Sequence, residues 1–402
     1  MNTYKWFFLM LVAGVVAGCQ KDSEAELIGD WQRRAPFPLN LSHASTFVIG
    51  NKGYVVGGTN GSRTMFRDVY EFDHTAANGQ GTWTSLGKTP PEMTARQQAV
   101  GFSLRHSNGK HYGYIGTGYG WVGEGKDADW ATLKDFWRYD KDNKSWEQVA
   151  PFPDDYQGVE AVARRGAIAF SLEDKSGKWY GYVGCGYTDE DGQKRLPTDF
   201  WQFDPEGTTP KKDGGEWIGR WTPVLGYGGS KRYGASVFVI DNKAYICNGE
   251  DLISGGHMKD FWRFDPNASE SEKWVKLRTM ADANRDEDYD DDYGTLARSY
   301  GVAYVVDVYQ AIGGAVQLRG HIVGGNKNGS NNWEYDHRED LWVRRTTLIN
   351  NQSPSGREGM IAFSFPETGK AFVGLGKANA LYYDDVWEFI PMIDDDAYSD
   401  IY

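Results

Sequence analysis

The hexapeptide Asp199-Phe200-Trp201-Gln202-Phe203-Asp204 decides the fold of this chain. It interleaves bulky aromatic residues with polar ones over six positions, which predicts a β-strand with one buried face. Five further segments repeat the pattern: Asp68–Asp73, Asp135–Asp140, Asp260–Asp265, Asn331–Asp336 and Asp385–Phe389. A strand of this length cannot bury its apolar face alone. The copies must therefore stack against one another in a repeat architecture.

Each repeat contains four strand-like segments. In the second repeat these are a small apolar segment at 99–104, a glycine-ended segment at 112–118, the aromatic strand, and a segment that begins at Trp146. The last aromatic strand lacks a Trp-led segment after it, whereas the strand-like segment 31–34 precedes the first repeat. We expect segment 31–34 to complete the last sheet, because this pairing removes an exposed edge.

These glycines, the aromatic strand and the Trp about a dozen residues later resemble the kelch repeat, from Trp31 to Phe389. The resemblance implies an all-β, six-bladed kelch-type β-propeller with four-stranded antiparallel blades. The segment Val16-Ala17-Gly18-Cys19 resembles the lipobox of bacterial lipoproteins. We therefore expect a signal peptide at 1–18, a tether at 19–28 with lipidated Cys19, a propeller at 29–390 and an acidic tail at 391–402.

The expected location is the outer membrane, on its periplasmic or surface face, with contact to the membrane through the lipid on Cys19. The net charge of −13 argues against a nucleic acid as partner, because such a surface repels phosphate on average. Cys185 and Cys247 lie in apolar strands at positions of opposite parity, so we expect free buried thiols rather than a disulfide.

Arginines recur six residues before an aromatic residue in five repeats: Arg96, Arg164, Arg232, Arg298 and Arg357. The first repeat has Leu41 at this place, with His43 two residues later. Innermost strands of a propeller converge on its axis, so these side chains are predicted to form a ring that binds an acidic ligand. In the alternative interpretation the arginines bind loop carbonyls or acidic residues of the protein. On the ligand interpretation, Arg164→Ala with Arg232→Ala weakens binding with little loss of stability.

Aromatic residues in the loops after the glycine-ended strands are predicted to rim the same mouth: Tyr119, Trp121, Trp130 and Tyr187. Such rings suit stacking on sugars or gripping a peptide. They could equally pin long loops onto the sheets.

Enzymatic chemistry has little support in the sequence. Galactose oxidase has kelch-like repeats, but the seven His residues show no short ligand spacing and no cysteine lies in a loop, so we expect no cofactor and no metal. A resemblance to the sialic acid mutarotases implies an acidic sugar and a catalytic carboxylate, for which Glu160 and Glu358, each near arginines, are the candidates. The lipobox and the acidic segment 286–292 depart from that family.

The sequence thus predicts an exported binding module for an acidic glycan or an acidic protein segment. The alternative is a mutarotase-like epimerase, and the second alternative is a scaffold without a small-molecule site. The acidic segment 286–292 could hold calcium, but position 12 counted from Asp288 is Ser299, so the spacing of an EF-hand is absent. A solvated loop is the expectation there.

Overall fold

The structure is a computed structural model of residues 1–402. It describes residues 29–61, 64–124, 128–192, 194–252, 254–283, 288–309, 316–327, 329–347 and 353–391. The predicted signal peptide, Cys19, the tether up to residue 28 and tail residues 392–402 lie outside these ranges. None of the helices in the described ranges has the length and apolar character that crossing a membrane requires.

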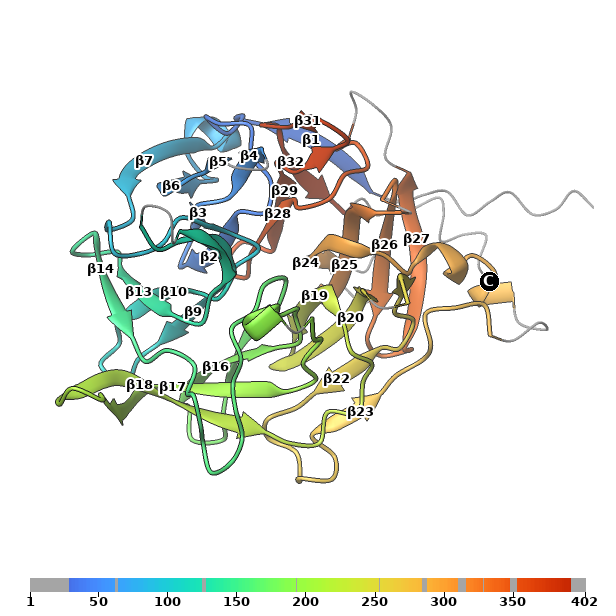
Figure 1. Cartoon of the computed structure of the whole chain (residues 1–402). Helices are drawn as coiled ribbons and strands as arrows, with labels where there is room; N and C mark the ends of the chain where they lie inside the picture. The colour runs from blue at the N-terminus through green and yellow to red at the C-terminus, as the bar shows by residue number, and fades with distance from the viewer. Residues whose placement is uncertain are drawn as a thin grey trace, which may run out of the picture.

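The described part of the chain is almost entirely β-strand and turn, and its helices are short 3₁₀ turns. Figure 1 shows antiparallel sheets arranged around a common centre. The first sheet runs β2 (Ser45–Ile49), β3 (Lys52–Val56), β6 (Asp68–Asp73) and β7 (Thr82–Lys88). The next runs β9 (Val100–Arg105), β10 (His111–Gly116), β13 (Phe136–Asp140) and β14 (Ser145–Val149). The third runs β15 (Ile168–Glu173), β16 (Trp179–Gly184), β17 (Phe200–Pro210) and β18 (Glu216–Val224).

The remaining sheets follow the same order. One runs β19 (Tyr233–Ile240), β20 (Lys243–Asp251), β22 (Trp262–Phe264) and β23 (Trp274–Lys276), with β21 (Gly256–His257) also on β20. The next runs β24 (Ser299–Tyr309), β25 (Val316–Asn326), β26 (Asn331–Asp336) and β27 (Leu341–Thr347). The last joins both ends of the described chain, as β28 (Ile361–Phe365), β29 (Lys370–Gly374), β32 (Val386–Ile390) and β1 (Asp30–Arg34).

The segment before the first repeat pairs with the last aromatic strand, as the sequence predicts. Strands β1 and β32 are antiparallel, with Asp30 opposite Ile390 and Arg34 opposite Val386. The third sheet differs from expectation, because β17 continues to Pro210 and β18 begins at Glu216 rather than at Trp221. The two strands resume pairing after a register shift that follows Asp204, and they form a long ribbon.

Neighbouring sheets pack through an aromatic ring seated on a glycine. A Cβ atom on Gly113 would lie 2.1 Å from the ring of Phe47, so only glycine leaves room for that ring. The same contact recurs as Gly53 with Phe363, Gly181 with Phe102 and Gly320 with Phe238. Because Phe363 belongs to the last sheet and Gly53 to the first, this packing also joins the two ends of the repeat series.

The innermost strands surround a central cavity of about 500 Å³. Residues from β2, β9, β15, β19, β24 and β28 all line it, and many are small, among them Gly101, Ala169, Ala303 and Ala362. The lining includes Asp307 and the hairpin residue Gly369, so the cavity extends toward the hairpins that follow the innermost strands. The predicted arginines precede these strands and lie at the other end.

Candidate functional site

Four of the predicted ring arginines pair with an Asp residue that lies one or two positions before the aromatic strand of the same sheet. The pairs are Arg96–Asp135 at 2.7 Å, Arg164–Asp199 at 2.6 Å, Arg232–Asp260 at 2.5 Å and Arg357–Asp385 at 2.5 Å. Each Asp also accepts a hydrogen bond from the indole N–H two residues later, from Trp137, Trp201, Trp262 and Trp387. The repeated unit of Arg, Asp and Trp ties the loop before an innermost strand to the aromatic strand of its sheet.

Burial of these units shows that they are part of the protein interior. The Arg164 side chain is 0 % exposed, and its guanidinium donates to both carboxylate oxygens of Asp199. Burial alone would raise the pKa of Asp199, but the charge and hydrogen bonds of Arg164 hold that pKa below its ordinary value. Asp135 shows the same balance with Arg96.

Arg298 is held without a carboxylate, because its repeat has Asn331 where the others have Asp. Its guanidinium donates to the backbone carbonyls of Leu296, Gly324, Asn331 and Thr295. Burial lowers the pKa of Arg298 to about 10. All five predicted arginines thus have partners within the protein, as the alternative interpretation of the sequence describes. Their role in ligand binding stays a prediction.

The residues two positions after these arginines form a backbone ring around the axis. All have positive φ values: His43 (53°), Gln98 (54°), Gly166 (59°), Gly234 (62°), Tyr300 (54°) and Gly359 (63°). Backbone N–H groups donate around the ring from Gln98 to His43, from Gly166 to Gln98, from Gly234 to Gly166, from Gly359 to Tyr300 and from His43 to Gly359. The first and last repeats are therefore joined at the axis by a main-chain hydrogen bond.

Two side chains from this ring fill its centre. A Cβ atom on Gly166 would lie 3.0 Å from the Tyr300 hydroxyl, so Tyr300 reaches across the ring from the fifth repeat to the third. The His43 ring packs against Gly359 and makes an edge contact with Tyr300, with ring centres 4.9 Å apart. Burial, together with the charges of Lys377 and Arg165, lowers the pKa of His43 to about 3, so this imidazole is neutral at ordinary pH.

Arg165, which directly follows the buried Arg164, lies among aromatic side chains near this backbone ring. Its guanidinium carbon lies 4.1 Å from the centre of the Tyr119 ring and 5.0 Å from that of Tyr187. Trp130 stacks on Tyr119 with ring centres 5.5 Å apart, and Trp121, which is 50 % exposed, makes an edge contact with Trp130. The structure thus brings the predicted Tyr119, Trp130 and Tyr187 together around Arg165. It shows no ion pair of Arg165 within the described part of the chain.

A carboxylate network lies on the next repeat. Glu250 accepts a hydrogen bond from the Tyr233 hydroxyl and another from Ser299, whose Oγ atom lies 3.1 Å away. His257 approaches the same carboxylate, with Nε2 at 3.6 Å. Tyr233 and Tyr187 have ring centres 6.2 Å apart, so this network adjoins the Arg165 stack. Burial, the hydrogen bond to Glu250 and its charge raise the pKa of Tyr233, so its hydroxyl stays protonated.

The two carboxylates predicted for catalysis have different surroundings. Glu358 lies across the mouth and pairs with Lys377 at 3.2 Å, through side chains on facing backbone segments. Glu160 is exposed and lines a surface pocket with Lys194, Arg195 and Lys231, and the structure pairs Arg164 with Asp199 instead. Glu358 therefore adjoins the mouth, and no ion pair joins Glu160 to Arg164 or Arg165 among the described residues.

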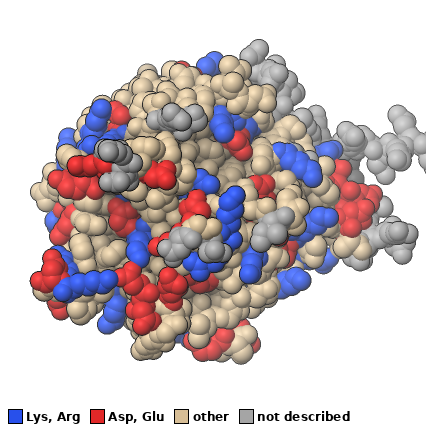
Figure 2. Space-filling view, viewed as in Figure 1, with Lys and Arg blue, Asp and Glu red and all other residues tan. Residues whose placement is uncertain are grey.

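We define the mouth cluster as Tyr119, Arg165, Tyr187, Tyr233, Glu250, Glu358 and Lys377. Figure 2 shows acidic and basic side chains together around the centre of the corresponding face. Arg165, Tyr233 and Glu250 are not among the site residues predicted from the sequence. The sequence does contain a pattern that could have identified this cluster. Three of its residues directly follow a repeated arginine: Arg165, Tyr233 and Glu358. Their backbone partners in the next segment of the same repeat are three more of its residues: Tyr187, Glu250 and Lys377.

Comparisons with known proteins address the fold alone. No protein-family model matches the sequence, and a search of curated proteins finds no match. Among solved structures, the one titled "Structure of YjhT" aligns with a TM-score of 0.59 and 14 % sequence identity, over 90 % of this chain and 98 % of that chain. Together with the antiparallel sheets around one centre, this likeness gives the chain a kelch-like β-propeller fold.

Proposed function

We propose that the chain is a closed, six-bladed kelch-type propeller that binds an acidic glycan at its mouth cluster without chemical conversion. Closure in this proposal rests on the pairing of β1 with β32 and on the hydrogen bond from His43 to Gly359. The location belongs to the proposal as well: export behind a signal peptide at 1–18 and anchoring to the outer membrane through Cys19, supported by the lipobox-like segment.

The observation that carries the binding proposal is the guanidinium of Arg165 between two tyrosine rings. The contacts with the two rings hold the guanidinium in place, and its five N–H donors suit a carboxylate as an additional acceptor. Three acids near this stack have partners of their own: Glu358 pairs with Lys377, Glu250 accepts from Tyr233 and Ser299, and Asp189 accepts from Thr132. Arg165 is thus the charge in the mouth cluster that is available to an anion.

The aromatic residues favour a sugar as the carrier of that anion. Trp121, Trp130 and Tyr119 form a continuous set of rings that begins at the exposed rim and ends at Arg165. Aromatic side chains bind the apolar face of a sugar ring, while the hydroxyls and the carboxylate of an acidic sugar bind polar groups of the protein. An acidic protein segment would use the same arginine, and the experiment below separates the two ligands.

A mutarotase-like activity on an acidic sugar is the second candidate function. It is favoured by Glu250, whose carboxylate is hydrogen-bonded to Tyr233 and lies near His257 beside the Arg165 stack. Ring opening of a sugar requires removal of the proton from the anomeric hydroxyl and delivery of a proton to the ring oxygen. A carboxylate and a protonated tyrosine side by side could serve these two roles.

The test is a thermal-shift titration of the full chain in detergent with N-acetylneuraminic acid and with the neutral sugar N-acetylmannosamine. We expect a saturable rise of the melting temperature with the acidic sugar alone. Arg165→Ala should weaken this binding about 10-fold or more, because it removes charge-assisted hydrogen bonds. The control variant Arg220→Ala removes an arginine that is 55 % exposed on β18 and should leave binding unchanged.

Equal affinity of the wild type and Arg165→Ala would contradict the proposed site. If neither sugar shifts the melting temperature but poly-glutamate peptide does, the ligand is an acidic protein segment. If nothing acidic binds, the scaffold interpretation holds. Interconversion of the sugar anomers, followed by NMR and lost in Glu250→Gln with binding retained, would establish the enzymatic alternative.

A further inference from the structure

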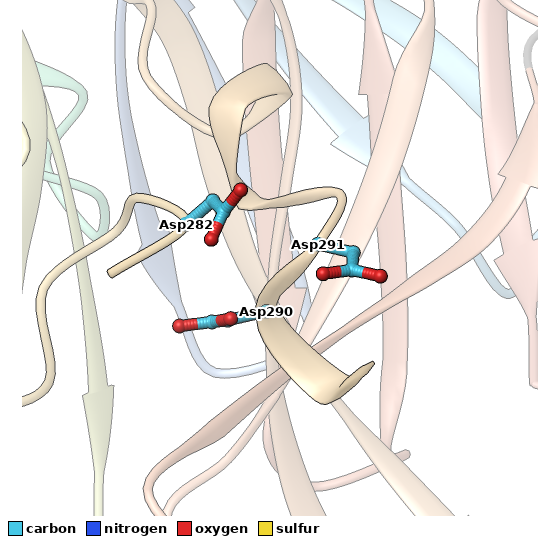
Figure 3. Close-up of side chains that lie close together, drawn as sticks. All are labelled: Asp282, Asp290 and Asp291. Atoms are coloured by element: carbon cyan, nitrogen blue, oxygen red, sulfur yellow. The ribbon is translucent and has the colours of Figure 1, made fainter. Parts of the chain in front are cut away.

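The loop that joins β23 to β24 brings three carboxylates together. One oxygen each from Asp282, Asp290 and Asp291 lies within 4.8 Å of the other two. Asp282 is on one arm of the loop, while Asp290 and Asp291 are on the other, at the end of the 3₁₀ turn η4 (Asp288–Asp290) (Figure 3). Carboxylates at such spacing repel one another unless a cation or a proton lies between them.

Asp290 has an oxygen that the protein leaves without a partner. This residue is 3 % exposed, and its Oδ2 accepts a hydrogen bond of 3.1 Å from the backbone N–H of Ala283. Its Oδ1 is buried and has no hydrogen-bond partner. A buried carboxylate oxygen without a partner is costly, and a cation bound to this atom would remove that cost.

The described acid next to the cluster has a basic partner, whereas the three acids of the cluster have none among the described residues. Asp292, the next residue, forms an ion pair with Arg344 at 3.3 Å. Within the described residues, no Lys, Arg or His forms an ion pair with Asp282, Asp290 or Asp291. The cluster therefore combines three carboxylates without an ion pair and one buried carboxylate oxygen without a donor.

We propose that Asp282, Asp290 and Asp291 bind a calcium ion. All the side-chain ligands are oxygens, which suits a hard cation and disfavours metals that prefer nitrogen or sulfur. Asp282 and Asp291 are exposed, so water can complete the six to eight oxygen ligands that calcium takes. The sequence analysis expected a solvated loop here, because the spacing of an EF-hand is absent. In the structure, the three carboxylates come together because the two arms of the loop lie side by side, which no spacing along the sequence indicates.

The ion would hold this loop against the following sheet. Just after the cluster, the Tyr293 hydroxyl donates to the carbonyl of Trp342 and accepts from its N–H, at 3.0 and 2.7 Å. The carbonyls of Thr295 and Leu296 then accept hydrogen bonds from Arg298. Calcium between the two arms would therefore stabilise the connection from β23 to the buried partners of Arg298. This role is independent of any ligand at the mouth cluster.

Terbium luminescence tests the site directly, because Tb³⁺ replaces Ca²⁺ on oxygen ligands and emits when nearby tyrosines transfer energy to it. Tyr289 precedes Asp290 in sequence, and its ring centre lies 6.2 Å from that of Tyr293. With the full chain in detergent, we expect saturable emission that excess Ca²⁺ displaces. Calcium alone at ten times its Kd should raise the melting temperature by about 2 °C.

Three variants decide the outcome. Asp290→Asn and Asp282→Asn should each lower the Tb³⁺ affinity at least 10-fold, and Asp282→Asn, at an exposed position, should melt like the wild type without metal. The control Asp213→Asn changes an exposed acid elsewhere and should bind Tb³⁺ as the wild type does. Absence of sensitised emission, or emission that Asp282→Asn leaves unchanged in a folded protein, would overturn the proposal.

Discussion

Replacing Arg164 by Ala tests whether the repeated units of Arg, Asp and Trp hold the propeller together. The substitution removes a fully buried guanidinium and leaves Asp199 without its charged partner. Removal of one partner from a buried ion pair costs about 3–5 kcal/mol. Asp199 is 23 % exposed, so water can reach it, and we expect the lower end, about 3 kcal/mol.

The expected loss can be read as a change in melting temperature. Unfolding entropy is about 2.1 cal/mol/K per residue, so about 3 kcal/mol lowers the melting temperature of a propeller of this size by about 4 °C. Calorimetry or circular dichroism measures this value on purified protein. Arg165→Ala is the matched control, since the adjacent arginine is partly exposed and stacks on tyrosines, which contributes about 1 kcal/mol or less.

A double-mutant cycle with Asp199→Asn separates the pair from the general effect of losing a long side chain. Coupling of about 2 kcal/mol or more between the two substitutions is expected. An Arg164→Ala variant that melts within about 1 °C of the wild type, or a cycle with no coupling, would refute the reasoning. That result would return the arginine to the ligand-binding role that the sequence first suggested.

Three further predictions concern the same interior. Asp135, Asp199 and Asp260 have pKa values below the ordinary 3.8, so their stabilisation is present above that pH and is lost as the pH falls below it; Asp199→Asn should flatten the fall in unfolding free energy between pH 5 and 2 in acid denaturation. Burial and nearby positive charges lower the pKa of His43 from 6.5 to about 3, so between pH 6.5 and 5 the unfolded chain takes up a proton at this residue and the unfolding free energy falls by about 1.6 kcal/mol. Burial lowers the pKa of His106 and His321 as well, so in urea titrations at both pH values His43→Asn should reduce the total difference by about 1.6 kcal/mol, and an unchanged difference would contradict the argument. Gly359→Ala should lower the unfolding free energy by about 2–3 kcal/mol, since φ is +63° and the new Cβ would lie 2.8 Å from the His43 ring. The control Gly109→Ala, at φ +80° in open space, should lower it by about 1 kcal/mol. Equal losses in the two variants would contradict the packing argument.

The sequence reveals the repeat but conceals what the arginines do. The aromatic strands and the pairing of segment 31–34 with the last strand follow from residue patterns, because strand periodicity and edge pairing are local or terminal properties. The direction of the Arg96 side chain depends on Asp135, a partner 39 positions away. Asp135 is part of the repeated sequence pattern, but its contact with Arg96 forms only when the strands of the sheet are assembled.

The packing between sheets and the backbone conformation at the axis could not be predicted from the sequence either. Gly113 reads as a strand glycine, and only the stacked sheets show that Phe47 occupies the space where its side chain would lie. His43, Gln98 and Tyr300 have positive φ although none is glycine, and no local pattern predicts this conformation for such residues. These residues take part in backbone hydrogen bonds between repeats, and the conformational preferences of residues within one repeat do not predict such bonds.

The backbone ring with Tyr300 across it acts as a septum between two unlike compartments. On one side is the cavity of about 500 Å³ between the innermost strands, and on the other is the mouth cluster. Because His43 and Tyr300 pack against glycines of this ring, the axis is narrowed between the hairpin end and Arg165. A substitution that enlarges the cavity at one face therefore lies on the far side of this ring from the residues of the other face.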